Sequence, residues 1–246
     1  MFRFKNSGLI VACILLLCFL PIMAYAAGNM TIDSFSKAKK LLLNKVYYDH
    51  RISFYCDCPF KSDQTIVPTD KFSPMTKHFK RSARVEWEHV VPAQSFGQSF
   101  KEWREGAEGC VGRNGKSFKG RKCAEKVSME YRHMQADLYN LTPADGQINA
   151  LRSNYSYAMI PGEYRQFGKC DFEIENQKVE PRPEIRGDIA RIYFYMDDAY
   201  PGHGIISKKN IKLFQAWDRQ DPVDDWERER AKRIETIQGN KNRFVQ

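Results

Sequence analysis

The segment from Arg84 to Gly97 (RVEWEHVVPAQSFG) holds two carboxylates and a histidine within four residues, a spacing that hydrophobic periodicity does not explain. Cutting a phosphodiester needs a base that takes a proton from water and positive charge beside the phosphate. A hard ion such as Mg²⁺ prefers a few protein oxygens together with waters and phosphate oxygens. The side-chain types for this chemistry, a carboxylate, an imidazole, an amide and a guanidinium, occur at Glu88, His89, Asn149 and Arg121.

The element that must present Glu88 and His89 is a short strand. The run from Val85 to Val91 is rich in valine, and Pro92 ends it. Because neighbouring residues of a regular strand face opposite sides, the two side chains can share a site only where the strand ends or is distorted. Most Glu-His pairs are surface residues, so this pair by itself does not identify a site.

The tetrapeptide TPAD at residues 142–145 predicts the start of a helix. Its threonine would be the cap, its proline the first helical residue and its aspartate part of an acidic capping box. The helix would carry Asn149 and Arg152 on one face, three residues apart. Gly146 weakens such a helix, so tertiary contacts must help to hold it.

The rest of the chain predicts one α+β domain over residues 27–246, because strands and helices are interspersed without a βαβ rhythm. We expect a long polar surface connection over 61–84 and strand-like residues over 169–183. Amphipathic periodicity predicts helices over 34–50, 187–200, 207–219 and 221–237.

A flexible basic loop is expected over residues 105–122, which hold five glycines and five basic residues. Cys110 and Cys123 flank this loop and are close enough in sequence to staple it. Closing a loop of this length stabilises a fold by about 3 kcal/mol. If the loop meets a nucleic acid, Lys116 and Lys119 are the expected phosphate contacts.

The N-terminus has the pattern of a secretory signal peptide over residues 1–26. Arg3 and Lys5 precede an apolar run, and Ala24-Tyr25-Ala26 places small residues at the two positions that a signal peptidase reads. An uncleaved membrane anchor is the alternative, but the apolar run is short for a span. Cleavage would lower the formal net charge from +9 to +7, because it removes two basic residues and no acidic one.

A basic, exported protein suits a polyanionic partner, which charge alone does not identify among nucleic acid, membrane surface and acidic polysaccharide. Export also leaves five cysteines in an oxidising compartment, where they pair if geometry permits. Cys170 is expected to pair with Cys56 or Cys58, and one thiol remains. A zinc site is disfavoured, because Cys56-x-Cys58 lacks the usual two-residue gap.

Six stretches occur in an order that resembles the endonuclease I family of periplasmic and secreted nucleases. They are RVEWEHVVPA, GRKC, HMQADLYNLTPADGQINALRSN, GDIARIYFYM, LFQAWDRQDPVDDWERERAKRI and IQGNKN, and the similarity runs from about Ala38 to Phe244. The resemblance implies a mixed fold around an embedded ββα-metal (His-Me) finger. It further implies a Mg²⁺-dependent endonuclease that cuts DNA and RNA with little sequence preference and leaves 5′-phosphate ends. We expect a monomer in which Mn²⁺ can replace Mg²⁺.

The same resemblance implies roles for individual residues. His89 matches the general base, and Glu88 and Asn149 match the metal ligands. Arg121 matches the arginine that contacts the phosphate during cleavage. Asn140 matches a residue that supports the site without binding the metal.

Two features set limits on this interpretation. Family members commonly carry further cysteines before the strand, whereas this chain has none between Cys58 and Cys110, so residues 64–81 are expected to be less firmly stapled. Glu86 is expected to be structural or solvated.

The rival functions are a catalytically idle exported protein that binds nucleic acid and a basic protein that binds acidic polysaccharide.

Overall fold

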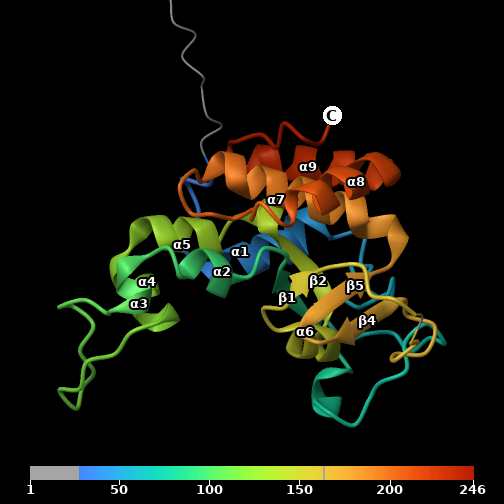
Figure 1. The fold of residues 1–246 in the computed structure, drawn as a ribbon, viewed down its shortest axis with the longest axis horizontal. Coiled ribbons are helices and arrows are strands. Elements are labelled where there is room, and N and C mark those ends of the chain that lie inside the picture. Colours follow the sequence, from blue (N-terminus) through green and yellow to red (C-terminus); the bar gives the residue numbers. More distant parts are fainter. Residues whose placement is uncertain (1–27, 163) are drawn as a thin grey trace, which may run out of the picture.

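The computed structural model describes residues 28–162 and 164–246. The expected signal peptide lies outside this part of the chain. Helices and short strands form an α+β fold, which confirms the class expected from the sequence (Figure 1). Within the described residues, no helix is both long and apolar enough to cross a membrane.

An antiparallel pair of strands that are far apart in the sequence, together with the helix that follows the second strand, forms the centre of the fold. Strand β1 (Val85–His89) is antiparallel to β2 (Leu141–Asp145), with Glu88 opposite Thr142. Helix α6 (Gly146–Arg152) begins directly after β2. This β1-β2-α6 unit therefore joins the residues around Glu88 to those around Asn149.

The prediction that TPAD starts a helix is wrong. Residues 142–145 belong to β2, because β1 offers them a full antiparallel register and Phe54 N–H donates to Pro143 O on the other edge. Asp145 precedes the helix but forms no side-chain cap, since its carboxylate accepts from Cys56 N–H at 3.3 Å. Long-range strand pairing has overridden a local capping signal.

Gly146 is required where α6 begins. A Cβ at this position would lie 2.6 Å from Arg81 O and 2.9 Å from Arg84 O. The glycine that weakens the helix locally thus allows the chain before β1 to approach α6 closely.

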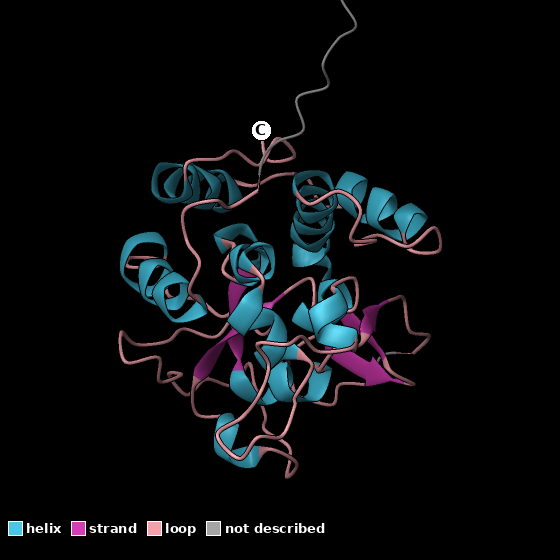
Figure 2. Ribbon diagram, turned by 90° about the vertical axis from the view of Figure 1, so that its left-hand side faces the viewer, coloured by secondary structure: helices cyan, strands magenta, loops and turns pink. Residues whose placement is uncertain are grey.

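The longer helices gather on one side of the molecule, as Figures 1 and 2 show. They are α7 (Arg186–Ala199), α8 (Ile211–Gln220) and α9 (Asp225–Gln238). The shorter helices are α1 (Phe35–Leu41), α2 (Ala93–Gly97), α3 (Lys101–Arg104), α4 (Arg121–Val127) and α5 (Met129–Gln135). Helices α3, α4 and α5 lie at the left of Figure 1, with α1 and α2 between them and β1. Single 3₁₀ turns span Phe79–Arg81, Leu138–Asn140 and Pro183–Ile185.

A second sheet lies beside the first, with strand order β3-β5-β4. Its strands are β3 (Ser156–Tyr157), β4 (Phe172–Glu175) and β5 (Lys178–Pro181), so the prediction of strand over 169–183 is confirmed. The expected helix over 34–50 starts after the cap Ser34 but ends early, in a π-helical turn over Leu42–Val46. The helix expected from residue 207 begins instead at Ile211.

Two disulfides join the cysteines that the sequence left to be paired. Cys110 is bonded to Cys123, as predicted, and Cys170 is bonded to Cys56. Cys58 is free and buried. The first bond closes the basic loop at its base, and the second ties the segment before β1 to the second sheet.

We expect thiol titration of the denatured, unreduced mature protein to find one thiol. Replacing Cys110 and Cys123 together by serine should lower the free energy of unfolding by about 3 kcal/mol, because the loop between them is no longer closed in the unfolded chain. Urea unfolding measures this loss of stability, and Cys58→Ala is the control because it removes a cysteine without breaking a disulfide. Three or more titratable thiols in active protein would contradict this pairing.

Candidate active site

One pocket gathers the side chains that the sequence singled out for chemistry. It has a volume of about 480 Å³, and its walls include Glu88, His89, Arg121 and Asn149. These residues come from the end of β1, the start of α4 and the middle of α6. The fold thus brings together residues that are up to 61 positions apart in the sequence.

A buried arginine explains how neighbouring residues of one strand reach the same pocket. Arg152 Nη1 donates to Glu88 Oε1 at 2.9 Å and to His89 O at 3.0 Å, and Nη2 donates to Val90 O at 2.8 Å. Carbonyls of consecutive residues point in opposite directions in a regular strand. The Arg152 guanidinium binds the carbonyls of both His89 and Val90, so these two carbonyls point the same way. Regular strand geometry therefore cannot continue past His89, where β1 ends.

Asn140 fixes the chain just beyond this point. Its side-chain oxygen accepts from Val91 N–H at 2.7 Å, and its amide donates to Val91 O at 3.0 Å. Its backbone oxygen accepts from Val90 N–H at 3.0 Å. Asn140 does not line the pocket, so it fixes the backbone after His89 without facing the pocket itself.

His89 is held as a neutral imidazole with a defined tautomer. Its Nε2 lies 2.9 Å from Gln135 O, and a carbonyl only accepts, so Nε2 carries the proton and Nδ1 has a free lone pair. The ring packs on Phe35, with 4.9 Å between centroids. Burial lowers the pKa of His89 to about 3, and the positive charge of Arg121 acts in the same direction.

Glu88 is buried, and one of its oxygens is already engaged. Oε1 accepts from Arg152 and from the Tyr55 hydroxyl at 3.1 Å. Burial raises the pKa of Glu88, while the charge of Arg152 opposes that shift. No hydrogen bond from the described chain reaches Oε2, which leaves this oxygen for a ligand.

Asn149 is oriented by a carboxylate. Its Nδ2 donates to Glu86 Oε2 at 3.2 Å, so the amide oxygen is left for another partner. Glu86 also forms ion pairs with Arg81 and, at 3.4 Å, with Arg84. The expectation that Glu86 is structural is therefore consistent with its contacts.

Arg121 is the exposed first residue of α4. Its Nε donates to Gln135 Oε1 at 3.2 Å, and its guanidinium lies 5.5 Å from the centroid of the Phe35 ring. Gln135 thus contacts both Arg121, through its side chain, and His89, through its backbone oxygen. The same amide donates to Glu125 at 3.0 Å, which fixes its orientation.

Comparison with known proteins places this chain in a family. A model of the Endonuclease I family matches residues 34–246. The chain belongs to this family. It is 40% identical over 216 residues to an extracellular deoxyribonuclease of Aeromonas hydrophila, covering 85% of this chain and 88% of the relative. It is 39% identical over 220 residues to Endonuclease-1 of Buchnera aphidicola, covering 87% of this chain and 81% of that relative. An extracellular ribonuclease of Bacillus subtilis is 36% identical over 134 residues, covering 44% of this chain and 43% of that relative.

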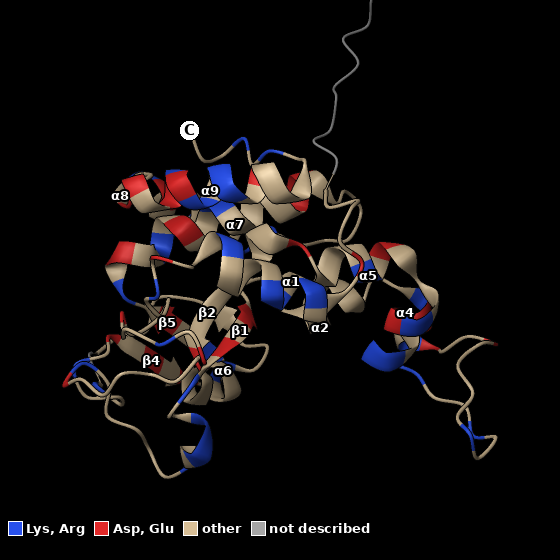
Figure 3. Cartoon of the chain, turned by 180° about the vertical axis from the view of Figure 1, so that it is seen from behind, with Lys and Arg blue, Asp and Glu red and all other residues tan. Residues whose placement is uncertain are grey.

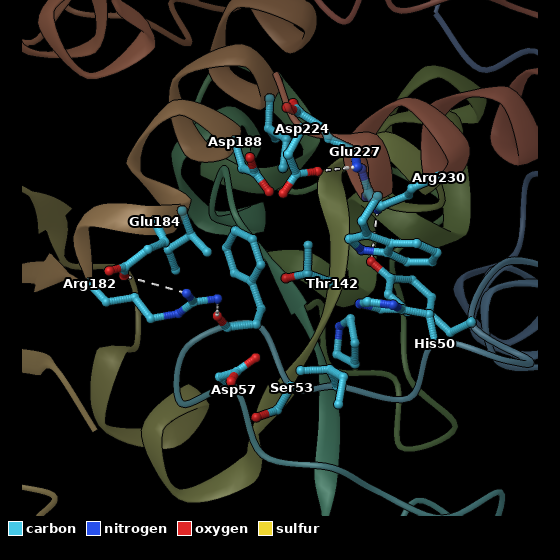
Figure 4. Close-up of a pocket in the computed structure, with 17 residues that line it drawn as sticks. His50, Ser53, Asp57, Thr142, Arg182, Glu184, Asp188, Asp224, Glu227 and Arg230 are labelled. Carbon is cyan, nitrogen blue, oxygen red and sulfur yellow. Dashed lines mark hydrogen bonds and ion pairs between the residues drawn. The ribbon is translucent and has the colours of Figure 1, made fainter. Parts of the chain in front are cut away.

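As a member of the endonuclease I family, the chain is a nuclease, and a second cavity is a poor candidate for its nucleic-acid site. This cavity of about 240 Å³ lies beside β2 and α9, and carboxylates including Asp188, Asp224 and Glu227 line it (Figure 4). Burial and the charge of Glu227 raise the pKa of Asp188 well above its usual value. An excess of carboxylates repels phosphate, whereas the pocket at His89 includes Arg81 and Arg121.

The sequence did not predict three residues that contact the side chains of this pocket. Arg152 was placed on the helix face with Asn149, but nothing in the sequence indicated that it is buried beneath Glu88. Phe35 lies in a predicted helix, and Gln135 lies in a segment for which the sequence predicted no element. A single residue that packs against a site gives a weak signal in the sequence, because its contacts depend on tertiary packing.

Proposed function

We propose that this endonuclease I family member is an exported, Mg²⁺-dependent, sequence-nonspecific endonuclease. It hydrolyses DNA, and also RNA, and leaves 5′-phosphate ends. The observation that carries the proposal is the single pocket that joins Glu88, His89, Arg121 and Asn149. Relatives named as extracellular and periplasmic deoxyribonucleases, and one named as a ribonuclease, support the location and both substrates.

The donor set in the pocket fits a hard cation. Across 28–162 and 164–246, no three His, Cys, Asp or Glu side chains group closely enough to hold a metal. A metal that binds by many protein ligands is therefore a poor fit. Mg²⁺ takes one or two protein oxygens together with waters and substrate phosphate. Glu88 Oε2 and the Asn149 amide oxygen supply these two oxygens, and Mn²⁺ accepts the same set.

The side chains divide the work of hydrolysis. When bound, Mg²⁺ supplies positive charge next to the phosphate and the leaving oxygen. His89 takes a proton from the attacking water at Nδ1, because Nε2–H is engaged by Gln135 O. Arg121 places its guanidinium beside the phosphate and stabilises the charge that develops there. Gln135 and Phe35 keep the base and the arginine in one arrangement.

The proposed ligands can be tested without relying on activity. Glu88→Gln and Asn149→Ala should each raise the Kd of Mn²⁺, measured by electron paramagnetic resonance, by at least about 10-fold, since even partners of ligands contribute that much. Glu184→Gln is the matched control, because Glu184 lines the acidic cavity instead. If Glu184→Gln weakens Mn²⁺ binding and the other two do not, the metal belongs in the acidic cavity.

Replacing Arg121 separates catalysis from binding. Arg121→Gln should lower kcat about 10²-fold, because one preorganised group that stabilises transition-state charge is lost. The KM for duplex DNA should change little. Single-turnover and steady-state rates on a labelled oligonucleotide measure both. A change confined to KM would make Arg121 an ordinary phosphate contact.

Incubating the mature protein with plasmid tests the function as a whole. Cleavage in Mg²⁺ that stops when EDTA is added is the expected result. Binding without cleavage would favour the idle nucleic-acid-binding protein. Neither binding nor cleavage would remove nucleic acid as the substrate.

A further inference from the structure

The acidic cavity beside β2 and α9 plays no part in the proposed nuclease mechanism. Its volume is about 240 Å³. Since a water molecule takes about 30 Å³, the cavity has room for a ligand of several non-hydrogen atoms. Its walls come from β2, α7, α9 and the segment before β1, so the tertiary fold builds it from distant parts of the chain (Figure 4).

One side of this cavity carries an excess of negative charge. Asp188 of α7 lies there with Asp224 and Glu227, at the upper side of Figure 4. Arg191 is shared as an ion-pair partner by Asp188, Glu227 and Asp218. Asp224 forms no ion pair within the described residues, and its carboxylate caps α9 by accepting from Glu227 N–H at 2.7 Å. Acidic residues on α8 and α9 are also visible in Figure 3.

The two arginines that line the cavity do not neutralise this side. Arg230 Nε donates to the Tyr47 hydroxyl at 2.8 Å, and its Nη2 donates to three backbone oxygens within residues 138–141. Arg182 pairs with Glu184 at 3.5 Å. Neither guanidinium lies within ion-pair distance of Asp188, so the cavity favours a positively charged ligand.

Two oxygen atoms of the wall are open to such a ligand. Thr142 is 1% exposed, and its Oγ1 has no hydrogen-bond partner in the protein. In Figure 4 it lies at the middle of the residues drawn, between Asp188 and Ser53. Asp188 Oδ1 accepts from Arg191 at 3.2 Å, whereas Oδ2 accepts no hydrogen bond from the described chain. A buried hydroxyl without a partner costs stability, and a ligand that donates to it removes this cost.

The remaining walls suit the apolar part of a ligand and the face of a cation. Phe54, Ile185 and Ile192 supply apolar surface. The rings of Tyr47 and Trp226 also line the cavity, with 5.3 Å between their centroids. Aromatic rings attract a cation that lies near their faces.

The donors of the wall distinguish between kinds of cation. Among the described residues, no three His, Cys, Asp or Glu side chains group closely enough to hold a metal ion. A guanidinium pairs best with both oxygens of a carboxylate, but Arg191 already occupies one oxygen of Asp188. A primary ammonium group is compact and has three donors, so it can use single oxygens from different residues.

We propose that this cavity binds a primary alkylammonium ion, whose N–H groups donate to Asp188 Oδ2 and Thr142 Oγ1 while its alkyl chain packs on the apolar wall. The inference does not rest on the nuclease function. Burial and the charge of Glu227 raise the pKa of Asp188 well above its usual value, and a bound cation opposes both effects by favouring the ionised carboxylate.

The test is an NMR titration of the mature protein at constant ionic strength, without Mg²⁺. The ligands are butylammonium and 1-butanol, which has a chain of the same length but no charge. The indole N–H signal of Trp226 reports on the cavity and is assigned by its absence in Trp226→Phe. The variants are Asp188→Asn and Thr142→Val.

The control variant is Asp225→Asn. Asp225 belongs to the same acidic stretch, but its side chain is fully exposed and does not line the cavity. Thr142→Val keeps the shape of the side chain and removes a hydroxyl that has no partner to lose. This variant should therefore fold, and it decides the question even if Asp188→Asn does not; urea unfolding checks both.

Butylammonium should shift the Trp226 signal with a Kd of about 1 mM or lower, within the affinity that so small a ligand can reach. Each cavity variant should raise this Kd about 10-fold, since a hydrogen bond to a charged group is lost, while Asp225→Asn leaves it unchanged. Equal binding of 1-butanol, an unshifted Trp226 signal, or an unchanged Kd in Thr142→Val would overturn the inference. Displacement of butylammonium by a lower concentration of Mg²⁺ would also overturn it, because the cavity would then be a metal site.

Discussion

His89→Ala lowers kcat by about 10²–10⁴, the range that a positioned general base contributes, while duplex affinity stays near that of the unmodified protein. The structure gives the reason. Nε2–H is committed to Gln135 O at 2.9 Å, so Nδ1 is the nitrogen that meets water. In the proposed mechanism the imidazole acts on water and does not hold substrate, so its loss should affect turnover and not binding. Single-turnover rates and anisotropy in EDTA measure the two quantities.

The control for this prediction is His133→Ala. His133 lies on α5, close to Gln135 in sequence, but its ring does not line the pocket. The His133 variant should retain its activity. If the His89 variant turns over at a near-normal rate, another group takes the proton and the tautomer argument is wrong.

Arg152→Met should destabilise the fold and stop catalysis together. Arg152 is 1% exposed and binds Glu88, His89 O and Val90 O. Removing one partner of a buried pair costs about 3–5 kcal/mol, because the other charge is left unpaired. The end of β1 also loses its only guanidinium contact among the described residues, so Glu88 and His89 no longer share a pocket.

Urea unfolding and single-turnover rates test this prediction with two comparisons. Arg243→Met breaks the exposed pair with Asp198 and should cost less than about 1 kcal/mol. Arg152→Met combined with Glu88→Gln should recover part of the stability, because the unpaired charge is gone, but none of the activity. Recovery of activity in the double variant would show that Arg152 does not position the site.

Much of the site could be predicted from the sequence, because its chemistry lies in short motifs. Glu88 and His89 stand side by side in one motif, and Asn149 and Arg121 each lie in another. All four residues line one pocket. Pro92 also indicated the end of β1, which explains how two neighbouring side chains reach one site.

The parts that could not be predicted depend on contacts between distant segments. TPAD carries a valid local capping signal, but pairing with β1 outweighs it. The sequence indicates only that Gly146 weakens a helix, whereas the fold shows that a Cβ at this position would lie 2.6 Å from Arg81 O. Arg152 and Gln135 act through burial and hydrogen bonds across the fold, and neither leaves a pattern in the sequence.

The most direct test of the account follows the oxygen of the attacking water. A duplex is cleaved under single-turnover conditions in ¹⁸O-water with Mg²⁺, and the fragments are analysed by mass spectrometry. A water activated at His89 that attacks the phosphorus and expels the 3′ oxygen predicts one ¹⁸O on a 5′-phosphate. Fragments that end in a 3′-phosphate, or a 5′-phosphate without label, would contradict the mechanism built on this pocket.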